Sequence, residues 1–376
     1  MAYASALPDT RETCVVSHLD PGPDGPYPVP MSVDCLNSLP FSQNKPWLAP
    51  LAGYSDLPFR LLCREFGAAV AVTEMVSAKG LVYGGKSTDE LLATCPQDQP
   101  LVVQLFGSDP EFLARGVDIC RERGFSWFDL NAGCPVKKVT KTGSGAALLV
   151  DPERLVDAVS AVCERAGPGR AGVKTRLGWD RNERVMPGLG PRLEQAGAAW
   201  ITLHPRFGKQ GFSGEASWGH LKELADVVSV PVIASGDLFT AEDGVRCVRE
   251  TGVATVMFAR GALADPRIFT RYTLLLSGET LMEGAPNPHD LAEVIRRHVA
   301  LMREHGNEHR ALLATRTIIP RYVRSMPGVR ALRNRLTYCK SWRDLDKELD
   351  AFLFSGLESN GNFPIVNTTD LPAEDI

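Results

Sequence analysis

Short apolar runs alternate with longer amphipathic segments from residue 47 to about residue 276. The apolar runs are rich in β-branched side chains and are bounded by turn formers, which predicts buried strands. Between them, segments such as 110–123, 152–166 and 241–251 have the period of an α-helix and open with Asp-Pro or Thr-Ala. The predicted strands lie at 47–52, 69–74, 101–105, 127–131, 172–176, 200–204, 232–235 and 255–258.

Eight consecutive strand–helix units predict the fold class of most of the chain. They fit a closed (β/α)8 TIM barrel better than an open sheet, because no GxGxxG motif opens the first unit. After a Gly/Pro/Asn link at 284–288 the pattern becomes purely helical, with expected breaks at Pro320 and Pro327. We therefore expect a flexible Pro-rich leader at 1–44, in which Met31 offers an alternative start, an α/β barrel at 45–285, a small all-helical C-terminal domain at 286–354 and an acidic tail at 355–376.

The composition is that of an ordinary soluble protein, with 44% of the 376 residues hydrophobic and 23% charged. No apolar run approaches the roughly 18 residues needed to cross a bilayer, and the first thirty residues lack the basic start and apolar core of a signal peptide. The nine cysteines form no CxxC pair, so we expect neither zinc nor an iron–sulfur cluster. These features predict a cytoplasmic, metal-free protein with no membrane contact.

The formal charge of −4 argues against wholesale nucleic-acid binding, but this charge is unevenly distributed. Residues 286–354 hold 13 bases and 8 acids, whereas residues 45–285 hold 27 bases and 28 acids. Between His309 and Arg343 there are nine Lys or Arg and no Asp or Glu. A solvated basic face would explain this block. A contact with a polyanion is favoured, because the preceding barrel balances its charges.

In a barrel of this type the chemistry lies at the C-terminal ends of the strands. Two of these ends have the character of a phosphate site: Ser235, Gly236 and Asp237 after the seventh strand, and Ala259 with Arg260 after the eighth. Glycine lets backbone N–H groups approach an anion, and an arginine supplies a charged fork. Tight turns would also explain the glycines, but two such motifs on neighbouring strands favour a phosphate.

Lys174 and His204 end the fifth and sixth strands, so the fold brings them to the same rim. A lysine that points into a barrel is costly unless it meets an anion. A flavin would satisfy both side chains through its phosphate, ribityl chain and ring edge, and Gln104 would hydrogen-bond that edge. The alternative is that Lys174 reaches solvent or pairs with Glu74.

Cys134 lies on a short loop bounded by Gly and Pro, directly after the fourth strand and over the expected barrel mouth. The ordinary pKa of a thiol, near 8.5, keeps it protonated at neutral pH, so Cys134 can act as a general acid. It can act as a nucleophile if a positive field activates it, and Lys137, Lys138 and Lys141 follow closely. The residues alone leave both roles open.

Eight sequence blocks carry a resemblance to one enzyme family, and the most specific is NAGCPVKK followed by a Gly-rich turn. The blocks are LAPLAGYSDLPFR (48–60), TEMVSAKGL (73–81), VVQLFGSDP (102–110), DLNAGCPVKKVTKTGSGAALL (129–149), VKTRLGWD (173–180), HPRFGKQGFSGEASW (204–218), VIASGDL (232–238) and MFARGAL (257–263). Together they resemble the tRNA-dihydrouridine synthases, flavoenzymes that reduce a uridine in tRNA to 5,6-dihydrouridine.

The resemblance implies a role for each matching position. Cys134 matches the catalytic cysteine, the acid that protonates C5 of uracil while reduced FMN delivers hydride to C6. Asn131, Arg176 and Arg206 match positions near the substrate base. NADPH, the usual reductant of the family, would bind transiently, and tRNA would be the partner of an expected monomer. The FMN-binding positions are Pro50, Leu51, Ala52, Gln104, Lys174, His204, Ser235, Gly236, Asp237, Ala259 and Arg260.

The chain departs from the family pattern mainly around the expected substrate loop. Members commonly have His-Gly/Ala-Arg-Thr where this chain has HPRF at 204–207, and Tyr where it has Phe212. They also commonly have Asn at Ser235 and Gly at Ala259, changes that leave the FMN site largely intact. Two rival functions remain: an FMN barrel acting on a free small molecule, which needs no basic C-terminal domain, and a non-catalytic RNA-binding protein, which needs no Cys134.

Overall fold

The computed structural model describes residues 38–279, 288–324 and 326–359. Its main feature is a closed ring of eight parallel strands: β1 (Trp47–Leu48), β2 (Val70–Val72), β4 (Leu101–Phe106), β5 (Trp127–Ala132), β6 (Ala171–Arg176), β7 (Ile201–His204), β8 (Val232–Ala234) and β9 (Thr255–Phe258). The sheet order is β2-β1-β9-β8-β7-β6-β5-β4, and a pairing between β2 and β4 closes the ring. A short strand, β3 (Val76–Ser77), also pairs with β4. Every predicted strand is present, so the predicted TIM barrel is confirmed.

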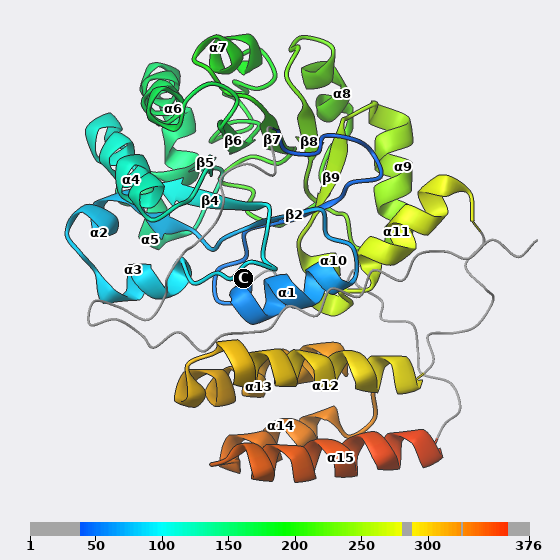
Figure 1. Cartoon of the computed structure of the whole chain (residues 1–376). Helices are drawn as coiled ribbons and strands as arrows, with labels where there is room; N and C mark the ends of the chain where they lie inside the picture. The colour runs from blue at the N-terminus through cyan, green and yellow to red at the C-terminus, as the bar shows by residue number, and fades with distance from the viewer. Residues whose placement is uncertain (1–37, 280–287, 325, 360–376) are drawn as a thin grey trace, which may run out of the picture.

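Helices surround the ring (Figure 1). The predicted helices at 110–123, 152–166 and 241–251 are present as α4 (Pro110–Glu122), α6 (Pro152–Ala166) and α9 (Ala241–Thr251). Each begins at a side chain that accepts a hydrogen bond from a free N–H of the first turn, namely Asp109, Asp151 and Thr240. The other barrel helices are α1 (Leu57–Glu65), α2 (Ala78–Val82), α3 (Lys86–Leu91), α5 (Lys137–Thr140), α7 (Gly190–Gln195), α8 (Gly219–Ala225), α10 (Arg260–Ala264) and α11 (Ile268–Ser277).

The strands separate two apolar cores, because successive side chains point to opposite faces. One set of positions packs between the ring and its helices. The alternate set fills the lower half of the barrel interior, and its largest members are Trp47, Trp127, Trp200 and Met257. Further along the same inward faces the side chains become polar, at Gln104, Asp129, Asn131, Lys174 and His204. The interior is therefore an apolar plug with a polar layer above it.

Residues 38–44, which the sequence analysis assigned to the leader, cover the base of the barrel. Leu39 is buried in the interior core, and the carbonyl of Pro40 accepts a hydrogen bond of 3.3 Å from the Trp47 indole. The Phe41 ring stacks on Trp47 and lies 5.9 Å from Trp200, between ring centroids. The packed chain thus begins earlier than the expected boundary at residue 45. Residues 1–37 of the leader lie outside the described residues.

Four helices follow the barrel: α12 (Pro288–His305), α13 (Glu308–Tyr322), α14 (Val329–Tyr338) and α15 (Trp342–Ser359). They form two layers, with α12 and α13 next to the barrel and α14 and α15 beyond them (Figure 1). The break expected at Pro320 is wrong, because α13 continues to Tyr322. Pro320 lies in the last turn, and its missing N–H removes one hydrogen bond of a helix whose neighbouring residues Ile318, Ile319 and Tyr322 are buried. Most of the link and the tail, at 280–287 and 360–376, lies outside the described residues.

The layer formed by α12 and α13 is attached to the barrel through α1. The Phe59 ring lies 5.6 Å from the His298 ring of α12, and His298 Nδ1 lies 2.9 Å from the Tyr322 hydroxyl. Burial lowers the pKa of His298 to about 3, so this histidine is neutral. At the exposed edge of the contact, the Arg297 guanidinium forms an ion pair with Glu65. A mixed apolar and polar contact therefore fixes α12 against α1.

The close packing of the Trp200 indole over Gly172 inside the barrel can be tested by mutation. A Cβ at Gly172 would lie 2.2 Å from the Trp200 indole, whereas a Cβ at Gly219 would meet nothing within 4 Å. We expect Gly172→Ala to lower the free energy of unfolding by about 1–3 kcal/mol, because the buried indole must move. Gly219→Ala, the matched control, should change it by less than about 0.5 kcal/mol. Equal denaturation midpoints for the two variants would contradict this packing.

Candidate functional site

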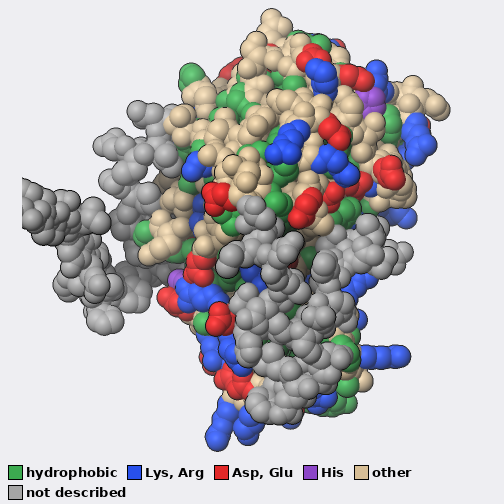
Figure 2. All heavy atoms as spheres, turned by 90° about the vertical axis from the view of Figure 1, so that its right-hand side faces the viewer, with side chains coloured by type: hydrophobic (Ala, Val, Ile, Leu, Met, Phe, Trp, Pro, Cys, Tyr) green, Lys and Arg blue, Asp and Glu red, His purple; other side chains and the backbone are tan. Residues whose placement is uncertain are grey.

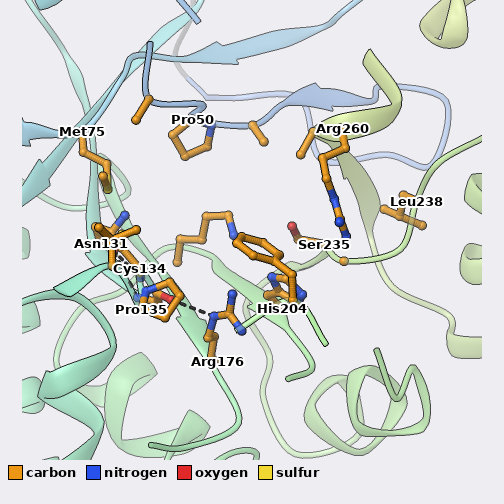
Figure 3. A pocket seen from close by; sticks show the side chains of 18 of the residues that line it. Pro50, Met75, Asn131, Cys134, Pro135, Arg176, His204, Ser235, Leu238 and Arg260 are labelled. Atoms are coloured by element: carbon orange, nitrogen blue, oxygen red, sulfur yellow. Dashed lines mark hydrogen bonds between the residues drawn. The ribbon is translucent and has the colours of Figure 1, made fainter. Parts of the chain in front are cut away.

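A pocket opens at the C-terminal ends of the strands, above the apolar plug. Its empty space is about 950 Å³, part of which is open to solvent. Figure 3 shows Cys134 and Asn131 on one side, Arg260 and Leu238 on the other, and Arg176 and His204 between them. Most of the strand ends with predicted chemistry contribute to this pocket.

Most of the predicted site residues line this pocket. They are Pro50, Ala52, Asn131, Cys134, Lys174, Arg176, His204, Ser235, Gly236, Asp237, Ala259 and Arg260. Strand register explains part of this set, since β5 pairs Asn131 with Lys174 of β6, and β6 pairs Arg176 with His204 of β7. The structure does not bring three other predicted residues into the lining. Leu51, Gln104 and Arg206 are each buried behind it.

The loop that carries Cys134 is held from two sides. The Asn131 side-chain oxygen accepts hydrogen bonds from the backbone N–H groups of Gly133, at 3.2 Å, and Cys134, at 2.9 Å. The Arg176 Nε–H donates to the Gly133 carbonyl at 2.8 Å. Burial raises the pKa of the Cys134 thiol, although the nearby cations oppose this shift. The thiol is therefore protonated at neutral pH, which suits a proton donor rather than a nucleophile.

Lys174 lines the pocket and has no acceptor among the described residues. No described residue accepts a hydrogen bond from its ammonium, and Glu74, the expected alternative partner, instead accepts the N–H of Gly53 at 2.5 Å. Burial and the nearby charge of Arg176 lower the pKa of Lys174 to about 8. A partly buried cation in this position favours an anionic or electron-rich group in the pocket.

The side of the pocket near β8 and β9 is rich in cations and closely packed. Arg206 forms a bidentate ion pair with Asp237 at 2.8 and 2.7 Å, and Arg260 reaches the same carboxylate at 3.3 Å. Burial, followed by the surrounding positive charges, lowers the pKa of His204 well below its usual value, so the imidazole is neutral. Gly236 has a φ of +98°, and a Cβ there would lie 2.6 Å from His204. Only glycine fits at this position.

Arg206 thus has a different setting from the one predicted. It is almost completely buried, and besides Asp237 it donates to the carbonyl oxygens of Ser213 and Gly214. These contacts hold the loop that follows β7 against the loop that follows β8. Arg206 itself does not line the pocket, and its hydrogen bonds fix two loops of the rim.

A buried hydrogen-bond network that was not predicted from the sequence lies below the pocket. The Asp129 carboxylate accepts hydrogen bonds from the Gln104 amide at 2.7 Å and from the Trp200 indole at 3.2 Å. Gln104 in turn accepts from the Asn131 amide at 2.8 Å. Burial raises the pKa of Asp129 to about 6, although Gln104, Lys174 and Trp200 oppose the shift. The inward alternation of β5 was the available signal, since it places Asp129 two residues before Asn131.

Apolar residues complete the lining, and the prediction omitted them. They are Ala49, Met75, Gly133, Pro135, Val136, Phe212, Leu238 and Phe239. Phe212 is the most informative, because the guanidinium groups of Arg176 and Arg260 lie 5.3 and 5.1 Å from its ring centroid. Its place in the motif at 204–218 was the available sequence signal for a role in the site. The position of its ring near the guanidinium groups of Arg176 and Arg260 depends on the fold.

Within the described ranges no group of His, Cys, Asp and Glu side chains is arranged to hold a metal ion. The same part of the chain contains no helix with the length and apolarity needed to cross a membrane.

Comparison with known proteins agrees with these features. A family model described as dihydrouridine synthase (Dus) matches residues 47–355. Over 304 residues the chain is 33% identical to a probable tRNA-dihydrouridine synthase 1 of Synechocystis sp., covering 80% of this chain and 84% of that protein. Over 315 residues it is 32% identical to tRNA-dihydrouridine synthase B of Pseudomonas aeruginosa, covering 83% and 90%.

A solved structure of morphinone reductase is also similar, with a TM-score of 0.45 and 15% identity over 64% of this chain and 88% of that chain. That likeness is too distant to carry an argument. The family model and the curated relatives each extend over most of the chain, and the chain therefore belongs to the dihydrouridine synthase family, as its motifs predicted.

Proposed function

We propose that this protein reduces a uridine in tRNA to 5,6-dihydrouridine, with FMN bound in the pocket and NADPH as a transient reductant. We further propose that it acts in the cytoplasm as a monomer. The observation that carries the proposal is one pocket with a protonated thiol on one side and a cationic, glycine-containing rim on the other. The first can supply a proton, and the second suits the phosphate and ring edge of a flavin.

The chain's own residues fit FMN. Gly236 lets the backbone pass close to His204, where a Cβ would collide with the imidazole, and Arg260, together with the backbone at Ser235 and Ala259, lines the same side of the pocket. The Asp237 carboxylate does not repel a phosphate here, because two arginines neutralise it. Lys174, for which no described residue is an acceptor, and the neutral His204 would hold the ring edge and ribityl chain, with Pro50 and Ala52 against the ring. Bound FMN in its reduced form would supply the hydride for C6 of uracil.

Cys134 would deliver its proton to C5 of the uracil, and solvent would then reprotonate the thiolate. The raised thiol pKa keeps this proton available at neutral pH. Asn131 and Arg176 hold the loop of Cys134 through the backbone, so they would set the position of the acid relative to the base. Leu51 and Gln104, buried behind the lining, would support these residues from below.

A uridine within folded tRNA must leave its stack to reach such a pocket. Binding energy from elsewhere on the RNA would compensate for this cost. Arg330, Arg333, Lys340 and Arg343, on and after α14, are exposed, and within the described ranges none of them makes an ion pair. Figure 2 shows Lys and Arg side chains projecting from this lower end of the molecule. We propose that these side chains contact the tRNA backbone, with recognition by shape and charge.

Removal of the thiol tests the proposed chemistry. Cys134→Ala should retain bound FMN but lose at least about 100-fold in the rate of dihydrouridine formation, because a general acid contributes about 10²–10⁴-fold. The measurement is dihydrouridine per tRNA by mass spectrometry, with flavin occupancy from absorbance. Cys95→Ala removes a half-buried free thiol outside the pocket and should keep full activity. A fully active Cys134→Ala protein would refute the general-acid role.

Lys174 gives a prediction about pH. Its ammonium would bind FMN, and its pKa of about 8 in the free protein would rise on binding an anion. Affinity for FMN should therefore be constant below pH 8 and fall by up to about tenfold per pH unit above it. Titration of FMN fluorescence between pH 7 and pH 9 measures this dependence. Lys174→Met should bind FMN more weakly, and its affinity should not change with pH. The control, Lys222→Met on the exposed face of α8, should keep the pH dependence of the wild-type protein. A wild-type affinity that does not change with pH would count against the role of Lys174.

The exposed arginines of α14 test the proposed binding of tRNA. Arg330→Ala/Arg333→Ala should weaken tRNA binding by roughly tenfold and make the slope of log affinity against log salt shallower by about 0.9 for each phosphate that the variant no longer neutralises. Filter binding at several salt concentrations gives both numbers. The control is Arg165→Ala/Arg184→Ala, two exposed barrel arginines that are paired with Asp118 and Glu223. An equal effect in both double variants would show only a dependence on total charge.

A further inference from the structure

A continuous series of hydrogen bonds connects the apolar plug to the loop of Cys134. It passes from the Trp200 indole to the Asp129 carboxylate, through the amides of Gln104 and Asn131, and ends at the backbone N–H of Cys134. Its four hydrogen bonds are 2.7–3.2 Å long. All three side chains between the ends are at most 5% exposed, so water does not compete for their hydrogen bonds.

The chemistry of the carboxylate fixes the direction of the whole series. An ionised carboxylate only accepts hydrogen bonds, so Gln104 must turn its NH₂ group toward Asp129 and its carbonyl toward Asn131. Asn131 must then present its NH₂ group to Gln104, which leaves its carbonyl oxygen for the N–H groups of Gly133 and Cys134. Each amide has two orientations, and only one of them satisfies every member of the series.

We propose that Asp129 is a positioning residue, which sets the orientation of the Gln104 and Asn131 amides and thereby fixes the Cys134 loop for proton transfer. The residue acts through its neighbours and lies below the pocket lining. The test by enzyme activity rests on the proposed function. The test by hydrogen exchange of the Cys134 backbone does not depend on it.

A rival explanation is that Asp129 matters only through its charge, since its carboxylate lies close enough to Lys174 to influence the titration of that side chain. The two explanations predict different effects of removing the Trp200 indole N–H. If only charge matters, removal of the Trp200 N–H has no bearing on the loss of the carboxylate. If orientation matters, the indole decides which way a replacement amide must turn, because an indole can only donate.

Asp129→Asn is the first variant. Its amide meets two donors, the Trp200 indole and the Gln104 NH₂ group, and can accept from only one of them. Because the indole is fully buried, water cannot replace its partner. The side-chain amides of Gln104 and Asn131 should therefore each flip, so that oxygen and NH₂ group exchange places. The NH₂ group of Asn131 would then face the backbone N–H groups of Gly133 and Cys134, and the unmatched donors would lie at the more accessible Cys134 loop. We expect kcat to fall by up to about 100-fold while the KM for tRNA and the flavin occupancy stay within about twofold.

The deciding variant is Asp129→Asn/Trp200→Phe. Without the indole N–H, the asparagine can turn its oxygen to Gln104 and the original orientation returns. We expect kcat to recover to within about threefold of Trp200→Phe alone. Hydrogen–deuterium exchange of the peptide that contains Cys134 should be fast in Asp129→Asn and slow again in the double variant, with thermal midpoints measured alongside to separate loss of stability.

The outcomes are distinct. Recovery of both exchange protection and kcat in the double variant supports the positioning role. A double variant that is as slow as Asp129→Asn, or slower, would overturn it in favour of charge or packing. If the wild-type protein forms no dihydrouridine, the proposed function fails, and exchange protection alone still decides the orientation of the amides.

Discussion

Charge inside a closed barrel must be neutralised or hydrogen-bonded, and this requirement shapes the upper half of the molecule. Asp129 meets it with two buried donors, and Asp237 meets it with two arginines. Lys174 does not meet it within the described residues. Most charged side chains around the pocket are therefore paired with other protein groups. Lys174 is the exception among the described residues, and it faces the space where we propose that FMN binds.

The apolar plug below this layer makes the arrangement possible. Trp47, Trp127 and Trp200 fill the barrel interior and keep water from the base of the polar network. Gly172 contributes by having no side chain, since the Trp200 indole passes over it and reaches Asp129. The same packing that stabilises the barrel thus holds the carboxylate that orients the amides beneath Cys134. Stability and the geometry of the site depend on shared residues.

Much of the fold could be predicted because its signals are local. The β-branched runs and the capping residues Asp109, Asp151 and Thr240 define strands and helices without reference to distant parts of the chain. The strand ends also supplied most of the pocket lining, because parallel strands in a closed ring bring their C-terminal ends together. Pro320 misled the prediction, because the burial of Ile318, Ile319 and Tyr322 keeps α13 helical despite the hydrogen bond that the proline removes.

The remaining features depend on neighbours that are distant in sequence. Whether Gln104 faces a ligand or Asp129 is decided by the pairing of β4 with β5, and Arg206 turns toward Asp237 because two loops meet. Periodicity does not encode such contacts. The packing of residues 38–44 under the barrel is of the same kind, since Phe41 finds its partners at Trp47 and Trp200 only once the ring has closed.

We propose that the substrate of this pocket is a uridine held within tRNA. The most direct measurement is the dihydrouridine content, mapped by position, of unmodified tRNA transcripts incubated with purified FMN-loaded protein and NADPH. We expect conversion of uridine at a defined position, in proportion to NADPH oxidised, and no conversion of free uridine at the same concentration. Oxidation of NADPH by the loaded protein with every uridine of the tRNA left unchanged would contradict this proposal.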